Sequence, residues 1–457
     1  MLLPYPELPE ADAEHLPLLL STVRRIGARV DARTIDREMR IPDALLDELR
    51  AAGLFALLIP AAYGGLGLSP SGYARVIEEV AGIDVSLAVT LGGHQGIGCR
   101  GIALVGTPEQ KQRYLPPCAS GAWMASLGMT EPDAGSAIVN TQTRAVRQAD
   151  GSWVLNGRKT YITNGEWSHV FTLFARTEVD KGSVKQDRLS AFIVERGPGV
   201  TSGPPMHKMG IRGSSTTEIF LDDARVPAEN LLGPLGAGLR IARDVMTTGR
   251  GGLAAACLGI AKAALANAVR HANARRLGDQ PIARFELIRQ KIGDAAASIF
   301  AAESMVYLTT GAMGRSTADF TVEAAACKLA ASETALRVTN DCLQIAGGAG
   351  YMQDLPYERM VRDARITTIF EGTSEVLRLL IAMNSLEGLK RRLERLGGIL
   401  REGGAPGPEL PGELAETAAL AEATLDAADA GLADVLARLG GAISRMQLVQ
   451  HDLAEIV

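Results

Sequence analysis

The sequence predicts a multidomain α+β protein in which a helical domain, a β domain and a second helical domain follow one another. Its 457 residues exceed what a single hydrophobic core normally serves. Helical periodicity dominates both ends of the chain, whereas β-type runs cluster in the middle. Because the elements are segregated, and because no Gly-x-Gly-x-x-Gly motif opens a helix after a strand, a βαβ nucleotide-binding fold is disfavoured.

The first domain, predicted for residues 1–125, is helical. Between about Asp36 and Thr107 apolar residues recur at helical spacing, and one face carries Leu45, Leu46, Leu49 and Ala52 before a stop at Gly53. The stretch Pro60–Gly67 reads as a loop. The first residues, Met1–Leu18, carry prolines and acids and lack the features of a secretory signal or a transit peptide. We therefore expect a cytoplasmic protein.

The second domain, predicted for residues 126–238, is a compact all-β domain. Four short β-type runs mark it, namely Trp153–Gly157, Val170–Phe174, Ser190–Val194 and Thr217–Leu221. The pairs Asn156-Gly157, Gly197-Pro198 and Gly203-Pro204 are typical of turns and are expected to punctuate these runs.

The third domain, predicted for residues 239–388, is a helical bundle. One buried stripe is expected from the helical spacing of Leu253, Cys257, Ile260, Ala264 and Ala268. Further helices are predicted for Phe285–Tyr307 and Ala318–Ala346, and long helices with short links favour a bundle. A helical extension, residues 389–457, follows. It contains a Gly/Pro-rich linker at Gly403–Pro411, an apolar helical face from Leu414 to Leu439, and a last helical stretch at Leu448–Val457.

Composition and charge exclude several classes of function. The net charge of -5 argues against a nucleic-acid partner, because phosphate binding needs clustered Lys and Arg. The five cysteines are widely spaced without a CxxC pair, and the six histidines show no ligand spacing, so we expect neither disulfides nor a metal site. The 50 glycines and only 4 % aromatic residues indicate helices packed closely through small side chains.

Three stretches in or near the β domain carry residues suited to binding a ligand. Met129–Ser136 is either a simple turn or a loop whose N–H groups meet an anion or a heteroaromatic edge. Tyr161–Gly165 offers an aromatic ring and a hydroxyl two residues apart, which suit a flat ring; the alternative is a hairpin end with a core tyrosine. Lys208–Thr216, with two glycines and two basic residues, is either a mobile basic loop or a ligand-binding one.

Two further stretches lie in the third domain. Gln344–Tyr351 holds more glycines than a helix C-cap requires, and close approach of the backbone to a ligand is the usual reason for extra glycines. In Ile369–Glu375, Glu371 sits in an apolar neighbourhood just before a helix. Desolvation there raises the pKa of a carboxyl group and makes it a usable base near neutral pH; the alternative is a helix N-terminal acid.

These five stretches, in this order and at these intervals, resemble the acyl-CoA dehydrogenase family from about Ile41 to Leu386. The resemblance implies an N-terminal helical domain, a middle β-barrel-like domain and a C-terminal four-helix bundle. It also implies FAD as cofactor, an acyl-CoA thioester as substrate and electron-transferring flavoprotein as electron acceptor. The reaction is α,β-dehydrogenation to a trans-2-enoyl-CoA, in fatty-acid β-oxidation.

The resemblance assigns roles to individual residues. Glu371 matches the catalytic base that removes the α-proton while the β-hydrogen leaves as hydride to flavin N5. Substrate contacts are implied for Ser136, Arg250 and Gly372. FAD contacts are implied for Leu127, Met129, Thr130, Gly135, Ser136, Tyr161, Ile162, Thr163, Arg275, Gln344, Gly347, Gly348, Thr373 and Glu375, and Gln344 to Gly348 would reach the FAD of a neighbouring subunit.

The match is best to the very-long-chain branch of the family, on Thr247–Arg250, Ile369–Thr373 and the helical extension. That branch implies a homodimer whose extension touches the membrane. The tail after Leu386 has 71 residues and is either incomplete or shorter than in that branch, so peripheral membrane contact stays open, as does a dimer versus a tetramer. Two other functions also stay open: an acyl-CoA oxidase that passes electrons to O₂, and a non-catalytic assembly or scaffold protein on the same fold.

The sequence departs from the family pattern where a subunit would hold the adenosine diphosphate of FAD. The family motif Arg-x-x-Phe-Gly aligns with Arg275–Asp279, so the phenylalanine is missing and Gly278 stands in its place. The residue after Phe285 is Glu286 instead of glutamine. A lost aromatic contact and a carboxylate near pyrophosphate predict that FAD is easily lost.

Overall fold

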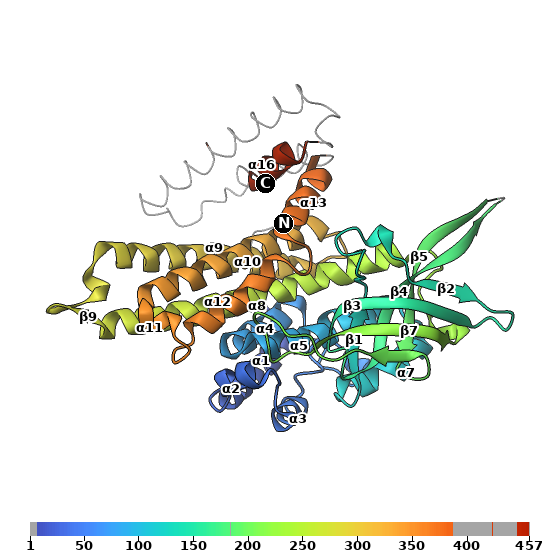
Figure 1. Ribbon diagram of the computed structural model, residues 1–457, viewed down its shortest axis with the longest axis horizontal. Helices are drawn as coiled ribbons and strands as arrows, with labels where there is room; N and C mark the ends of the chain where they lie inside the picture. Colours follow the sequence, from blue (N-terminus) through green and yellow to red (C-terminus); the bar gives the residue numbers. More distant parts are fainter. Residues whose placement is uncertain (1–6, 183, 387–422, 424–445, 457) are drawn as a thin grey trace. The chain divides into compact units, whose positions relative to one another are not determined.

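The computed structural model of the chain describes residues 7–182, 184–386, 423 and 446–456 (Figure 1). It divides into a large unit, Tyr5–Glu371, and a small unit that contains Gly372–Val457, and each is described by itself. The order of elements in the large unit is helices, strands, helices, as predicted.

The N-terminal helices form a core of their own. They are α1 (Glu10–Gly27), α2 (Ala32–Glu38), α3 (Asp43–Ala51), α4 (Pro70–Ile83), α5 (Val85–Leu91), the π-helix η2 (Gly92–Gly98), α6 (Arg100–Val105) and α7 (Pro108–Ala119). Leu46 and Leu49 of α3 are buried, and the chain turns at Gly53 with φ of 73°. The predicted loop Pro60–Gly67 holds only the short 3₁₀ turn η1 (Ala61–Tyr63).

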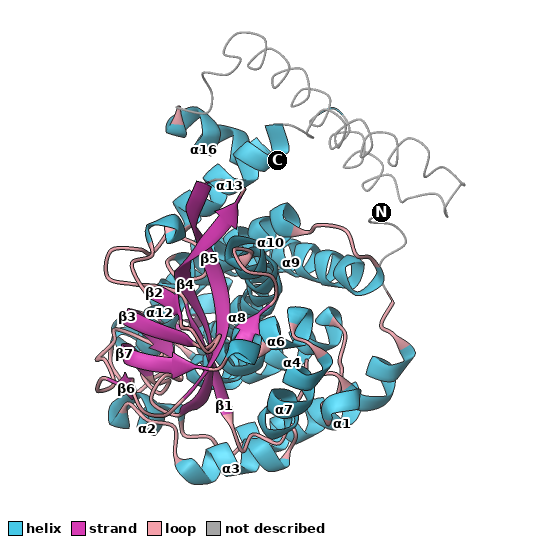
Figure 2. Cartoon of the chain, turned by 90° about the vertical axis from the view of Figure 1, so that its right-hand side faces the viewer, coloured by secondary structure: helices cyan, strands magenta, loops and turns pink. Residues whose placement is uncertain are grey.

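The described strands of the middle domain form one mixed eight-stranded sheet in the order β6-β7-β3-β2-β4-β5-β8, with β1 parallel to β4. The strands are β1 (Met124–Gly128), β2 (Arg144–Arg147), β3 (Trp153–Thr163), β4 (Ser168–Lys181), β5 (Val184–Glu195), β6 (Val200–Ser202), β7 (Thr216–Val226) and β8 (Leu231–Leu232). Figure 2 shows them grouped together in magenta. The four predicted runs fall in β3, β4, β5 and β7.

The sheet has two different faces because successive side chains of a strand point to opposite sides. Phe171 and Leu173 of β4 pack with residues of β3, β5, β6 and β7 in a core enclosed by the sheet itself. Val170 and Phe174 of β4 pack instead against α7 and the start of α8. The sheet therefore curls around its own core and rests its other face on helices.

One predicted turn is wrong. Asn156-Gly157 lies inside β3, not between strands, and the pairing of β3 with β7 shifts register between Leu155 and Gly157. Gly157 has φ of 153°, and a Cβ there would meet Thr143 Oγ1 within 2.4 Å. The glycine therefore forms a bulge where another segment approaches closely, which is a common use of glycine within a strand.

The C-terminal helices are α8 (Gly238–Ala274), α9 (Glu286–Arg315), α10 (Thr321–Ala346), α11 (Gly348–Tyr351) and α12 (Tyr357–Arg365), followed by the 3₁₀ turn η6 (Ile366–Thr368). A hairpin of β9 (Arg276–Leu277) and β10 (Gln280–Pro281) joins α8 to α9. The predicted stripe from Leu253 to Ala268 on α8 is buried. At one crossing a Cβ on Gly259 would lie 2.1 Å from Glu78 O, so α4 and α8 pack through glycine.

Helix α8 is also long and apolar enough to cross a membrane by length and composition, but 67 % of its most apolar window is buried inside the protein. We therefore interpret α8 as the core helix of the bundle.

The small unit contains α13 (Ser374–Leu386) and α16 (Gln447–Ile456), which pack together; Gln450 Nε2 lies 3.6 Å from Met383 Sδ. The predicted terminal helix is confirmed by α16 up to Ile456. The predicted linker Gly403–Pro411 and the apolar face Leu414–Leu439 lie outside the described residues.

Candidate active site

Glu371 occupies an unusual backbone position at the end of the large unit. Its φ is 58°, in the left-handed region that residues other than glycine rarely adopt. Arg250 Nε on α8 donates a hydrogen bond to Glu371 O at 3.3 Å. The neighbouring Gly249 leaves room for the carboxylate, because a Cβ there would lie 3.1 Å from Glu371 Oε2. Strained residues of this kind persist only where the surroundings fix them, and they cluster at functional sites.

The Glu371 carboxylate is buried, and its Oε2 has no hydrogen-bond partner among the described residues. Burial raises the pKa of Glu371, while the nearby cations Arg250 and Lys328 oppose that shift. Lys328 on α10 is itself fully buried, and burial lowers its pKa to about 8. A buried carboxylate with a raised pKa and a free oxygen is suited to accept a proton.

The π-helix η2 connects this carboxylate to the β domain. Ile97 Cγ2 lies 2.7 Å from the Cβ position of Gly249, and Thr163 Cγ2 lies 2.7 Å from the Cβ position of Gly93. Side chains at Gly93 and Gly249 would therefore collide with their neighbours. The buried ring of Tyr73 lies against Gly96 and Gly252 in the same way. Burial raises the pKa of Tyr73, and the charge of Glu371 adds to that shift.

The first two predicted ligand-binding stretches lie side by side. Thr160 N donates to Thr130 O at 2.9 Å, and Ser126 Oγ donates to Thr163 O at 2.7 Å. Tyr161 is 68 % exposed and has φ of 58°, so the alternative of a core tyrosine is wrong. Gly135 and Ser136 are exposed, and nothing lies within 4 Å of the Cβ position of Gly135.

A second group of predicted residues lies at the opposite end of the large unit. Arg275 directly precedes β9, and Gln344, Gly347 and Gly348 flank the junction of α10 and α11. In Figure 1, β9 and α11 lie at the left end of the helical bundle, whereas the sheet lies at the right. All four residues are exposed. The fold of one chain thus does not bring this group to Thr130 and Tyr161.

Three further predicted residues, Gly372, Thr373 and Glu375, belong to the small unit. Thr373 Oγ1 accepts a hydrogen bond from Val376 N at 3.2 Å, at the start of α13. Their roles at the site stay predictions.

Three family models match the chain in sequence order: the acyl-CoA dehydrogenase N-terminal domain at residues 14–122, the middle domain at 126–224 and the C-terminal domain at 236–386. The chain belongs to the acyl-CoA dehydrogenase family. Among curated relatives, the very long-chain specific acyl-CoA dehydrogenase of Bos taurus mitochondria is 41 % identical over 87 % of this chain and 62 % of its own length. The chain thus spans about three fifths of that relative.

Two further acyl-CoA dehydrogenases match this chain over a larger share of their own length. An acyl-CoA dehydrogenase of Bacillus subtilis is 38 % identical over 78 % of this chain and 93 % of its own. The solved structure of an acyl-CoA dehydrogenase from Bacillus anthracis complexed with FAD has a TM-score of 0.87 and 32 % identity, covering 99 % of this chain and 81 % of that one.

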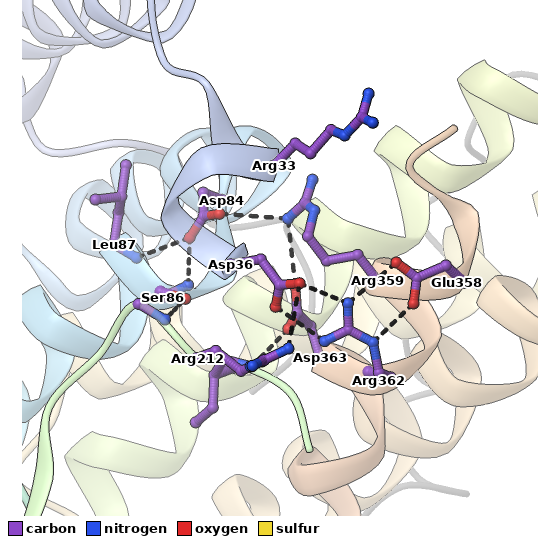
Figure 3. Close-up of polar contacts among 12 residues, drawn as sticks. Arg33, Asp36, Asp84, Ser86, Leu87, Arg212, Glu358, Arg359, Arg362 and Asp363 are labelled. Atoms are coloured by element: carbon purple, nitrogen blue, oxygen red, sulfur yellow. Dashed lines mark hydrogen bonds and ion pairs between the residues drawn. The ribbon is translucent and has the colours of Figure 1, made fainter. Parts of the chain in front are cut away.

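The third predicted stretch, Lys208–Thr216, packs against helix α12, so the alternative of a mobile basic loop is wrong. Ile211 N donates to Asp363 Oδ1 at 2.5 Å, and a Cβ on Gly210 would meet Arg362 O at 2.2 Å. Figure 3 shows the ion-pair network beneath this loop. Arg362 joins Asp36 to Glu358, and Arg359 lies between Asp84 and Asp363 at 3.3 and 3.4 Å.

Several site residues of this family member were missed by the sequence reasoning, namely Tyr73, Gly93, Ile97, Gly249 and Lys328. The four closely spaced glycines of η2, within an otherwise helical pattern, are the one local signal that marks an interrupted helix. The others are ordinary helical residues, and only their contacts across the fold reveal them.

Proposed function

We propose that the chain is an FAD-dependent acyl-CoA dehydrogenase that converts a saturated acyl-CoA to a trans-2-enoyl-CoA. The observation that carries the proposal is the buried Glu371 carboxylate, whose Oε2 lacks a partner and whose backbone is held by Arg250. Family membership supplies the reaction class, and Glu371 supplies the base.

The residues of the β domain fit FAD. Tyr161 is an exposed, strained aromatic residue next to Thr130 and Thr163, which suits a flat ring with hydrogen-bonding edges. Gly135 leaves open space beside them. When bound, FAD supplies the acceptor for the hydride that leaves the β-carbon.

Glu371 then has a defined task. Its raised pKa brings the proton affinity of the carboxylate closer to neutral pH, which favours removal of an α-proton. Gly249 leaves the carboxylate free to face the substrate, and the hydrogen bond from Arg250 to Glu371 O holds the strained backbone. The buried surroundings exclude water from the reacting carbon.

Partners and assembly follow from the same proposal. The substrate is an acyl-CoA, with long chains favoured by the branch resemblance, and electron-transferring flavoprotein is the electron acceptor. A homo-oligomer is supported by Arg275, Gln344, Gly347 and Gly348, which adjoin β9 and α11, the elements at the end of the bundle away from the sheet. A cytoplasmic location, with membrane contact left open, stays a prediction.

An anaerobic titration tests the proposed function. Acyl-CoA of increasing chain length is added to the FAD-loaded protein, and we expect the visible flavin band to bleach with at least one chain length. Glu371→Gln should keep FAD yet abolish bleaching. Full bleaching of that variant would refute the assigned base, and no bleaching of the wild type with any chain length would favour a scaffold. Hydrogen peroxide release in air would instead assign an oxidase.

A further inference from the structure

A fully buried ion pair lies behind the two stretches of the β domain that are proposed to bind FAD. Lys159 Nζ on β3 lies 2.7 Å from Glu131 Oε1 in the loop after β1, and the two side chains are 0 % and 4 % exposed. Lysine is almost never fully buried without a partner, because removing its charge from water is strongly unfavourable. This pair therefore lies in a buried environment where apolar side chains are energetically more favourable than charged ones.

The pair joins three separate segments. The Glu131 carboxylate accepts hydrogen bonds from Gln142 N at 2.5 Å and from Thr143 N at 3.0 Å. Lys159 Nζ also lies 3.3 Å from Met129 O. The loop after β1, the residues directly before β2, and strand β3 are thus fixed to one buried charge pair.

Both proposed flavin-binding segments adjoin this pair in sequence. Thr130 directly precedes Glu131, and Tyr161 follows Lys159 by two residues. The main chains of the segments also meet, through the hydrogen bond from Thr160 N to Thr130 O. Strand β3 shifts register between Lys159 and Ile162, and Tyr161 has φ of 58°. A strained residue needs surrounding contacts that fix it, and the buried pair provides them on one side.

We propose that Lys159 and Glu131 are positioning residues that hold Thr130 and Tyr161 in register for FAD. This inference rests on the proposed function. The two side chains act through the backbone they fix, since both are buried. A buried ion pair contributes little net stability compared with an apolar pair of similar volume, so its effect is expected in the geometry of the flavin site more than in the folding equilibrium.

The test replaces both charges at once, because removing one leaves the other buried and unpaired. Lys159→Met combined with Glu131→Gln keeps the volumes and one acceptor for the N–H groups. The matched control is Arg158→Met with Glu218→Gln, an ion pair between the same strand and β7 whose arginine is 51 % exposed. Each protein is purified with FAD. The dissociation constant of FAD and the visible circular dichroism of the bound flavin are then measured, the latter at saturating FAD.

We expect the double variant to unfold cooperatively like the wild type, to bind FAD about tenfold more weakly, and to show an altered flavin circular dichroism, while the control matches the wild type. Unchanged affinity and spectrum in the double variant would overturn the inference and leave the proposed function standing. A wild type that binds no FAD would overturn both. If the double variant does not fold, Lys159→Gln with Glu131→Gln, which replaces both charges by amides that can hydrogen-bond to each other, is measured in the same way with the same criteria.

Discussion

At the scale of single residues, the site is defined by Glu371 and the glycine opposite it. The pKa of this carboxyl is raised by burial, and the cations that oppose the shift do not cancel it. A raised pKa in the folded state means that the folded protein holds the Glu371 proton at pH values where the unfolded chain has lost it. Stability from this group is complete below the unfolded pKa and is lost as the pH rises through the folded pKa.

The pH dependence of flavin reduction follows from that shift. The proposed base Glu371 works only when deprotonated, so the rate of anaerobic bleaching by acyl-CoA should fall as the pH decreases through the raised pKa. The acid limb should therefore lie above the usual range of a glutamate. Stopped-flow bleaching between about pH 4 and pH 9 measures it, with substrate well below saturation so that the profile reports the free protein. A limb at the pKa of an ordinary exposed glutamate would contradict the burial argument.

Gly249→Ala should slow flavin reduction strongly while the protein still folds. The added Cβ would lie 2.7 Å from Ile97 Cγ2 and 3.1 Å from Glu371 Oε2, so the base or the π-helix must move. A misplaced catalytic group loses on the order of a hundredfold in rate. The control is Gly251→Ala on the same helix, where the nearest atom, Thr310 Cγ2, lies at an ordinary 3.6 Å. Equal bleaching rates for the two variants would show that Gly249 makes no room for the base.

At the scale of elements, sequence patterns predicted the helices and buried faces that depend on local hydrophobic periodicity. The third predicted helix begins within three residues of α10 and ends with it, and the stripe on α8 is buried, because burial of one helix face repeats along the sequence. Helix α9 continues to Arg315, eight residues beyond the predicted Tyr307, because nothing in the local pattern marks its end. The bulge at Gly157 was missed because it depends on Thr143 of another segment.

The candidate site likewise divides into residues that local motifs mark and residues that only contacts between distant segments reveal. Glu371 and Tyr161 were singled out through motifs in continuous sequence, and their roles stay predictions. Lys159 and Glu131, and the anchoring of Ile211 by Asp363, depend on residues far apart in the chain. The spacing of residues in the sequence does not predict such contacts. The basic, glycine-containing loop Lys208–Thr216 was therefore open to interpretation as a mobile loop, and only the structure shows that Asp363 anchors it.

The anchor beneath that loop predicts a pH-dependent stability. Burial raises the pKa of Asp363 to about 7, with Asp84 adding to the shift and Arg359 opposing it. The stabilising contribution is therefore present below the ordinary pKa of an aspartate and is lost as the pH rises through about 7. Asp363→Asn keeps an acceptor for Ile211 N and cannot ionise.

Thermal unfolding at pH 5 and pH 8 checks this prediction. The melting temperature of Asp363→Asn relative to the wild type should increase between the two pH values, by an amount equivalent to on the order of 1 kcal/mol. Asp354→Asn, at a carboxylate that is 81 % exposed, should show no such trend. An identical pH dependence in the wild type and Asp363→Asn would contradict the assignment.

At the scale of the whole molecule, the proposed FAD contacts within the large unit fall into two groups at its opposite ends. Tyr161 lies in β3 and Thr130 is hydrogen-bonded to that strand, whereas Arg275 precedes β9 and Gln344 lies near the end of α10, next to α11; β9 and α11 lie at the other end of the bundle in Figure 1. A single FAD meets both groups only if they come from different subunits. Cofactor retention and assembly should therefore be linked, so that diluting the oligomer releases FAD.

Glu286→Gln should then strengthen FAD retention. Glu286 opens α9, next to the hairpin that carries Arg275, and its carboxylate would repel a pyrophosphate held there by a neighbouring subunit. The measurement is the FAD-to-protein ratio after gel filtration over a dilution series at low salt. Asp294→Asn removes the same charge two turns along α9 and should leave the ratio unchanged. A wild type that keeps one FAD per chain through extensive dilution would contradict the predicted weak binding. In that case the hairpin would hold the cofactor even though Gly278 replaces an aromatic residue and Glu286 carries a negative charge.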